Sequence, residues 1–172
     1  MTNEAEPLTL VLVGPMAAGK TSVGRRVARR LGVAFIDTDK RIVAAHGPIP
    51  EIFATHGEAH FRELERAAVR EALAEGGVIS LGGGAVTDPE TRALLRAHPV
   101  VFLSVSEAAV ADRLRGGTRP LLAGEDPVEK WKRIFAERRG WYDEVASTTF
   151  DTSRRPMQRI ADEIVAWRRE QR

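Results

Sequence analysis

Eight residues near the N-terminus have the types and spacing of a phosphate-binding loop. Gly14 to Thr21 reads GPMAAGKT and fits G-x-x-x-x-G-K-[ST], after an apolar run and before a helical pattern. Backbone N–H groups in such a loop surround a polyphosphate, and the positive end of the following helix adds to the attraction. Lys20 supplies a point charge for the β and γ phosphates, and the Thr21 hydroxyl suits a Mg²⁺ ligand. The stretch therefore predicts a nucleotide-binding site.

The lysine in this loop supports that interpretation. The chain carries most of its positive charge on arginine, and lysine occurs only at Lys20, Lys40, Lys130 and Lys132. A glycine-containing turn between a strand and a helix is the alternative, but such a turn does not require a lysine at this position.

Two carboxylates, Asp37 and Asp39, follow a predicted short strand over 33–37. One of them can orient Mg²⁺ through a water molecule, and the other can accept a hydrogen bond from an acceptor hydroxyl. The same pair would also serve to cap a helix. Because it follows a strand beside a phosphate loop, a functional role is favoured.

Three consecutive glycines, Gly82, Gly83 and Gly84, stand at the end of another predicted strand. Without side chains, their main-chain N–H groups can come close to a small ligand. A flexible turn is the alternative, and we favour a binding role.

Arg138 lies on the apolar face of a predicted helix over 127–145. That face is defined by residues three and four apart, namely Trp131, Ile134, Phe135, Tyr142 and Val145. A charge there requires an anionic partner. Arg139 points elsewhere and is expected to face solvent. Arg62, at the edge of the apolar face of a helix over 58–74, is a weaker candidate, and either guanidinium suits bidentate pairing with a carboxylate.

A mobile lid is expected at about 116–126, where glycine, proline and arginine occur without periodicity. Arg119 in this segment can close over a transferring phosphate as a cationic clamp. A solvated loop arginine is the alternative.

The bulk composition describes one globular domain. The chain has 172 residues, 43% of them hydrophobic, a formal net charge of +2 and no cysteine. These values exclude disulfides and thiolate chemistry and do not indicate nucleic-acid binding. No apolar run is long enough to cross a membrane, and the acidic start is unlike a signal peptide, so we expect a cytoplasmic protein. His56 and His60 are four apart but lack the H-E-x-x-H order of zinc proteases.

Strands and helices are expected to alternate along the chain. Strands are predicted at 8–13, 33–37, 78–81, 100–105 and 148–151, and helices at 20–31, 38–45, 49–56, 58–74, 89–97, 106–115, 127–145 and 156–169. Such alternation predicts an α/β fold with a parallel sheet that binds its ligands at the carboxyl ends of the strands. The glycines and carboxylates described above follow those ends.

With these residues in place, the chain resembles the shikimate kinase family, small P-loop enzymes of the nucleoside-monophosphate-kinase type, from about Leu8 to Ile164. The motifs that carry the resemblance are, in order, the loop Gly14 to Thr21, the pair Asp37 and Asp39, the segment Gly57-Glu58-Ala59-His60-Phe61-Arg62, the stretch Gly82-Gly83-Gly84-Ala85-Val86, and Arg119-Pro120-Leu121-Leu122. The resemblance implies ATP-dependent phosphorylation of the shikimate 3-hydroxyl. It also implies a three-layer P-loop fold with a five-stranded parallel sheet in the order 2-3-1-4-5. A single kinase domain would span 1–172, with a substrate-binding helical segment at about 38–75.

The resemblance also implies roles for individual residues. Shikimate would be held by Asp39, Arg62, Gly82, Gly83, Gly84 and Arg138, with both arginines on its carboxylate. Lys20, Asp39 and Arg119 would serve phosphoryl transfer, Thr21 would bind Mg²⁺, and Asp37 would orient the water of that ion. ATP would contact the loop through Gly14, Ala17, Ala18, Gly19, Lys20, Thr21 and Ser22, and its adenine would be flanked by Arg113 and Arg155.

This sequence departs from the family in its loop and after Arg138. Ala17 stands where the family often has glycine, and Gly140 and Trp141 precede Tyr142 where the family usually has a proline. Other functions considered are a kinase for another carboxylated polyol such as gluconate, a nucleotide kinase, and a non-catalytic ATP-binding regulator. A GTP switch is disfavoured because Asn3 is the only asparagine, which leaves no N-K-x-D motif. The enzyme is expected to act as a monomer.

Overall fold

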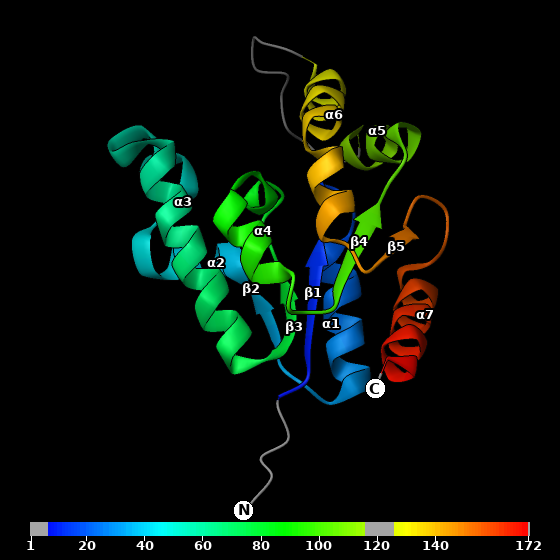
Figure 1. Ribbon diagram of the computed structural model, residues 1–172. Helices are drawn as coiled ribbons and strands as arrows, with labels where there is room; N and C mark the ends of the chain where they lie inside the picture. Colours follow the sequence, from blue (N-terminus) through cyan, green and yellow to red (C-terminus); the bar gives the residue numbers. More distant parts are fainter. Residues whose placement is uncertain (1–6, 116–125, 172) are drawn as a thin grey trace, which may run out of the picture.

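The computed structural model describes residues 7–115 and 126–171. They form a parallel β-sheet with helices around it (Figure 1). Its five strands are β1 (Thr9–Val13), β2 (Phe35–Asp37), β3 (Gly77–Ser80), β4 (Val100–Ser104) and β5 (Thr148–Asp151). They lie in the order β2-β3-β1-β4-β5, and every neighbouring pair is parallel. The predicted fold class and strand order are therefore confirmed.

The central strand β1 explains the layered arrangement. Leu10, Val11, Leu12 and Val13 are each at most 1% exposed. Because successive side chains of a strand point to opposite faces, Leu10 and Leu12 enter one hydrophobic cluster, and Val11 and Val13 enter the other. A strand that is apolar on both faces must be covered on both faces.

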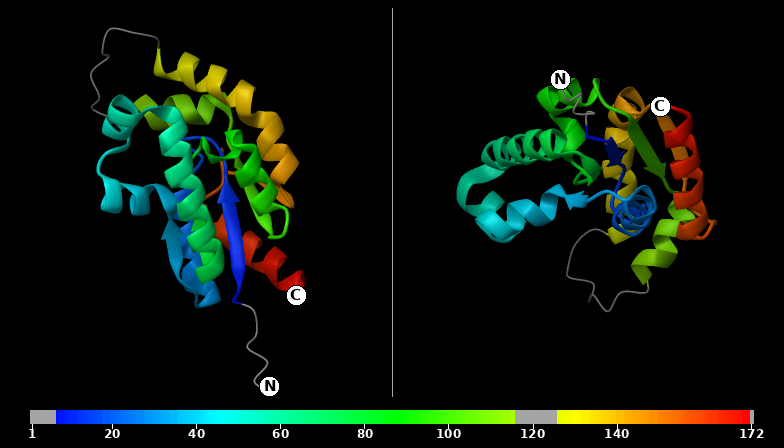
Figure 2. Two further views of the ribbon diagram at one scale, coloured as in Figure 1. Left: turned by 60° about the vertical axis from the view of Figure 1, so that its left-hand side comes forward. Right: turned by 90° about the horizontal axis from the view of Figure 1, so that it is seen from below.

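Helices cover both faces of this sheet (Figures 1 and 2). On the face of Leu10 and Leu12 lie α1 (Lys20–Leu31), α5 (Glu107–Arg115) and α7 (Met157–Glu170). On the other face lie α3 (Ile49–Glu75), the short 3₁₀ helix η1 (Ala85–Thr87), α4 (Pro89–Leu95) and α6 (Pro127–Val145). α2 (Thr38–His46) packs against α3 in a third cluster.

The helix boundaries agree with the sequence where a capping residue marks them. Asp88 caps α4 through the N–H of Glu90, and Asp126 caps α6 through the N–H of Val128. One detail differs from the expectation: α4 ends at Leu95, before the predicted end at 97. The two helices expected on either side of Gly57 are both present within α3, divided at Gly57, whose φ of 84° and ψ of 172° are not helical.

Two further expectations concern the lid and the membrane. Most of the predicted lid, including Arg119, lies outside the described residues. Within the described part of the chain, no helix has the length and apolar character needed to span a membrane.

Ala17 in the phosphate loop has an unusual backbone conformation. Its φ of 68° lies in the left-handed region, which costs a residue with a Cβ roughly 1–2 kcal/mol. Arg113 donates a hydrogen bond to the Ala17 carbonyl at 2.6 Å, and the Thr152 hydroxyl donates to the adjacent Ala18 carbonyl at 2.7 Å. These bonds from distant segments hold the loop in its strained shape.

Replacing Ala17 by glycine should therefore stabilise the protein. Glycine removes the left-handed penalty but costs about 0.4–1 kcal/mol through the unfolded state, so the net gain in unfolding free energy should be about 1 kcal/mol. Chemical denaturation measures this change. Ala18→Gly is the matched control: Ala18 is 0% exposed and has no positive φ, so that variant should lose stability. Equal losses in both variants would contradict the assigned strain.

Candidate active site

A cavity of about 1800 Å³ opens at the carboxyl end of the sheet. The phosphate loop follows β1, Asp37 ends β2, and the glycines follow β3, so the parallel strands deliver all three to this edge. The predicted site residues that line the cavity are Ala17, Gly19, Lys20, Thr21, Ser22, Asp37, Asp39, Gly82, Gly83, Gly84 and Arg138.

The phosphate loop presents open hydrogen-bond donors and a desolvated lysine. α1 begins at Lys20 without a side-chain cap, which leaves first-turn N–H groups free for an anion. Lys20 Nζ donates to the carbonyls of Gly14 at 2.7 Å and Pro15 at 3.0 Å. The side chain is only half-buried, yet desolvation lowers the pKa of Lys20 to about 8, although Asp39 and Asp37 oppose the shift.

The glycine loop passes against three charged side chains. A methyl group placed on Gly82 would lie 2.5 Å from Asp39 Oδ1, and one on Gly84 would lie 2.7 Å from Arg62 Nη2 and 3.2 Å from Arg138 Nη2. The φ of Gly84 is −93°, so its backbone does not require glycine, and a side chain there would have to displace the ends of the two arginine side chains. Asp39, Arg62 and Arg138 therefore converge on one short segment.

Asp39 has the environment of a proton acceptor. Burial, and secondarily the charge of Asp37, raise the pKa of Asp39 above the usual value of 3.8, while Lys20 and Arg62 act in the opposite direction. A carboxylate with a raised pKa is a stronger base than an exposed one.

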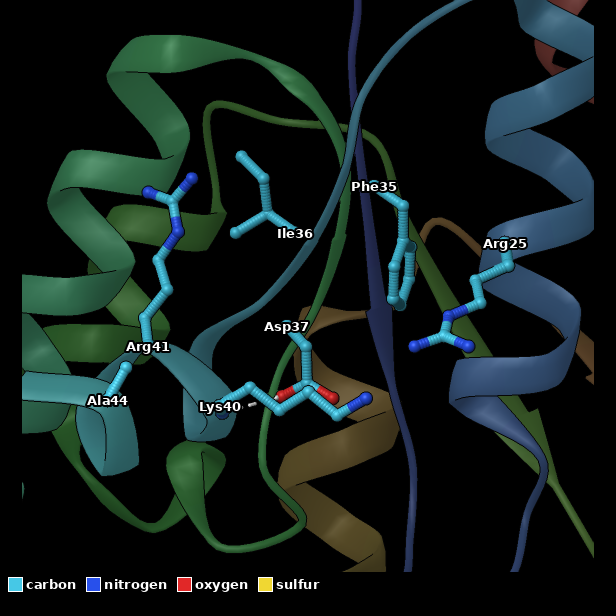
Figure 3. Close-up of a pocket in the computed structure, with 7 residues that line it drawn as sticks. All are labelled: Arg25, Phe35, Ile36, Asp37, Lys40, Arg41 and Ala44. Carbon is cyan, nitrogen blue, oxygen red and sulfur yellow. Dashed lines mark hydrogen bonds between the residues drawn. The ribbon is translucent and has the colours of Figure 1, made fainter. Parts of the chain in front are cut away.

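Asp37 has a different environment. It caps α2 by accepting a hydrogen bond from the backbone N–H of Lys40 at 3.1 Å (Figure 3). Asp37 and Thr21 both line the cavity. A carboxylate and a hydroxyl are oxygen ligands of the kind that Mg²⁺ prefers, so these residues fit that ion.

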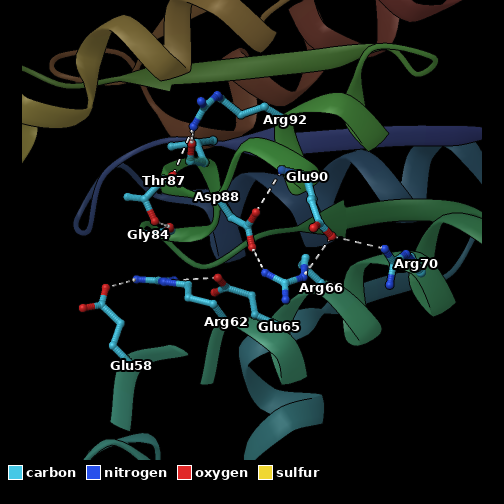
Figure 4. Close-up of polar contacts among 11 residues, drawn as sticks. Glu58, Arg62, Glu65, Arg66, Arg70, Gly84, Thr87, Asp88, Glu90 and Arg92 are labelled. Atoms are coloured by element: carbon cyan, nitrogen blue, oxygen red, sulfur yellow. Dashed lines mark hydrogen bonds and ion pairs between the residues drawn. The ribbon is translucent and has the colours of Figure 1, made fainter. Parts of the chain in front are cut away.

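Glu65 is a site residue that the sequence reasoning missed. It is 1% exposed, and its carboxylate pairs with Arg62 Nη1 at 2.5 Å (Figure 4). Burial raises the pKa of Glu65, and the Arg62 charge opposes that shift. Arg62 Nε is buried and has no partner among the described residues, so the guanidinium keeps capacity for a further hydrogen bond. Glu65 lies three residues after Arg62 on one helix, and this i, i+3 spacing is the feature of the sequence from which the ion pair could have been predicted.

Arg138 and Arg139 face different environments, as the helical pattern predicted. Arg138 is half-buried and lines the cavity, and it hydrogen-bonds the Tyr142 side chain. The side chain of Arg139 is 66% exposed and lies 3.9 Å from the Asp143 carboxylate.

Other predicted residues, Arg62 among them, are not in the wall of the cavity. Gly14 and Ala18 are buried within the loop. Arg113 lies beneath it, bonded to the carbonyls of Ala17 and Thr152. Arg155 is exposed and pairs with Glu163 of α7.

The matching family model, two curated relatives and a similar solved structure are all those of shikimate kinases. The family model described as Shikimate kinase matches residues 16–169. A shikimate kinase of Mycobacterium avium is 50% identical over 84% of this chain and 84% of its own, and one of Corynebacterium efficiens is 45% identical over 94% and 96%. The structure of a shikimate kinase from Acinetobacter baumannii in complex with shikimate superposes with a TM-score of 0.86 at 35% identity, covering 96% of this chain and 95% of that one.

The low pKa of Lys20 predicts pH-dependent nucleotide binding. Below about pH 8 the ammonium is charged and attracts the phosphates. Above that pH the free protein must take up a proton on binding, so affinity should fall by up to about tenfold per pH unit. Calorimetric titration with ADP at about pH 7 and about pH 9 measures the change, and Lys20→Met should bind weakly at both. Equal wild-type affinities at both values would refute the lowered pKa.

Proposed function

This chain belongs to the shikimate kinase family and catalyses the ATP-dependent phosphorylation of the shikimate 3-hydroxyl. We propose that the reaction takes place in the cavity at the carboxyl ends of β1, β2 and β3. One observation supports the assignment most strongly: Asp39, Arg62 and Arg138 converge on the Gly82–Gly84 segment beside the phosphate loop. Asp39 and Arg138 then line one cavity with the phosphate loop, and Arg62 meets the same glycine segment without lining that cavity.

Arg62 and Arg138 hold the carboxylate of shikimate. Their Nη2 atoms both lie close to the position of a methyl group on Gly84, at 2.7 and 3.2 Å. Two guanidinium groups at one place attract a single anion strongly and fix its orientation through paired hydrogen bonds. Glu65 holds Arg62 from the buried side, so the side chain is oriented before the ligand arrives. The main chain of Gly82, Gly83 and Gly84 lines the rest of the acceptor site.

Asp39 accepts the proton of the 3-hydroxyl of shikimate. At the same time the 3-hydroxyl oxygen bonds to the γ-phosphorus of ATP, and the bond between that phosphorus and the leaving oxygen of ADP breaks. Its raised pKa suits that task. Lys20 is near enough for its charge to act on Asp39, and it stabilises negative charge on the transferring group. The reaction is mainly a matter of position and charge.

The remaining nucleotide contacts follow the loop. Mg²⁺, when bound, neutralises phosphate charge, and Thr21 and Asp37 would hold it directly and through water. Gly14, Ala17, Ala18, Gly19 and Ser22 would contact the phosphates, and Arg113 and Arg155 would flank adenine. Arg119 stays a prediction, since it lies outside the described residues.

The organisation of the protein is also part of the proposal. We expect one kinase domain over 1–172 that acts as a monomer in the cytoplasm. The shared hydrophobic clusters on both faces of a single sheet support one domain.

Removing Arg138 should impair the use of shikimate. In Arg138→Ala the substrate carboxylate loses one partner, and kcat/KM for shikimate should fall by roughly 2 kcal/mol or more, mainly through KM. Arg62→Ala should act in the same direction, while KM for ATP should change little. A coupled assay of ADP release with shikimate, and with gluconate as a competing acceptor, measures both constants.

Arg139→Ala is the matched control, because that neighbouring guanidinium is exposed. Its shikimate kinetics should equal those of the wild type. Harm from Arg139→Ala together with normal kinetics in Arg138→Ala and Arg62→Ala would overturn the carboxylate assignment.

A further inference from the structure

Three aromatic side chains form a column along α6. Trp131, Phe135 and Tyr142 are spaced by four and seven residues, so they share one face of the helix. Ring centroids lie 5.0 Å apart for Trp131 and Phe135, and 6.3 Å apart for Phe135 and Tyr142. Phe102 of β4 stacks on Tyr142 at 5.1 Å. Trp131, Tyr142 and Phe102 are at most 6% exposed, so packing fixes their rotamers.

The two ends of this column bind different loops of the active site. The indole Nε1 of Trp131 donates to the Met16 carbonyl in the phosphate loop at 2.8 Å. The Tyr142 hydroxyl donates to the Gly83 carbonyl in the glycine loop. These donors are eleven positions apart, about 16 Å along a helix that rises 1.5 Å per residue. One rigid helix therefore contacts both the nucleotide loop and the acceptor loop.

A second set of contacts secures the glycine-loop end. Arg92 donates to the carbonyls of Val86 and Thr87 in η1 (Figure 4). It also pairs with Glu144 of α6 at 2.9 Å and lies 5.2 Å from the Trp141 ring. At the other end, the Trp131 hydrogen bond joins α6 to the phosphate loop. Loss of this donor should loosen that end.

We infer that α6 is a brace that fixes the phosphate loop relative to the glycine loop, with Trp131 and Tyr142 as the positioning residues at its two ends. This inference rests on the proposed function, in which one loop holds the nucleotide and the other the acceptor. Arg138 projects from the same helix between Phe135 and Tyr142, so the brace also sets the position of the substrate carboxylate. Phosphoryl transfer needs donor and acceptor oxygens in line, and small misplacements are costly in rate.

Two conservative variants test the brace. Trp131→Phe and Tyr142→Phe keep an aromatic ring at each position and remove the donor at each end, and Tyr142→Phe also removes the hydrogen bond with Arg138. Each should lower kcat with shikimate and ATP by about tenfold. KM for ATP should change by less than about threefold in both variants, and KM for shikimate by less than about threefold in Trp131→Phe, because alignment and not binding is lost there. Trp167→Phe in α7, away from both loops, should match the wild type.

The double variant separates a brace from two local effects. Once one end of α6 is released, the bond at the other end no longer fixes one loop relative to the other. The kcat of Trp131→Phe/Tyr142→Phe should therefore be at most about threefold below that of the slower single variant. Independent effects would multiply to about a hundredfold and would overturn the inference. So would wild-type kcat in both single variants. Urea unfolding of each variant gives the folded fraction, and kcat is expressed per folded molecule, so that lost stability is not counted as lost alignment.

The inference and the proposed function fail separately. A wild-type protein that does not phosphorylate shikimate would refute the function. A wild-type protein that does, with unaffected kcat in the variants, would refute the brace alone.

Discussion

The close approach of the main chain at Gly82 and Gly84 to charged side chains is the constraint on which the site depends. A Cβ at Gly82 would force the Asp39 carboxylate to shift, and one at Gly84 would force the ends of Arg62 and Arg138 to shift. Opposite charges are paired in part of the site: Glu65 pairs with Arg62, and the charges of Lys20 and Arg62 act on the pKa of Asp39 against the effect of burial. These interactions offset part of the free-energy cost of desolvating several charged side chains that lie close together in the site.

The fold brings the strand ends and the helices around the glycine loop together at the carboxyl end of the sheet. Parallel pairing of β2, β3 and β1 places three loops side by side. Ion pairs then hold α3 against the loop that follows β3, since Arg66 pairs with the buried Asp88 that caps α4. α6 reaches the same loop from the other side through Tyr142. Helices on either side of the glycines thus fix the positions of both guanidinium groups.

Much of this could be predicted from the sequence, and the remainder has an identifiable physical reason. Apolar patterns and capping residues predicted the strands and most helix ends, and the apolar face of α6 separated Arg138 from Arg139. The resemblance, and not periodicity, gave the strand order. Periodicity does not reveal partners across the fold: Arg113 bonds to a carbonyl 96 residues away. The strained conformation of Ala17 likewise depends on bonds from Arg113 and Thr152 that no local pattern contains.

A crystal structure with shikimate and a non-hydrolysable ATP analogue tests the central claim most directly. The account predicts the shikimate carboxylate at about 2.7–2.9 Å from nitrogens of both Arg62 and Arg138. It also predicts the 3-hydroxyl oxygen within about 2.6–3.2 Å of the Asp39 carboxylate. A carboxylate bound away from the two arginines, with the 3-hydroxyl out of reach of Asp39, would contradict the account.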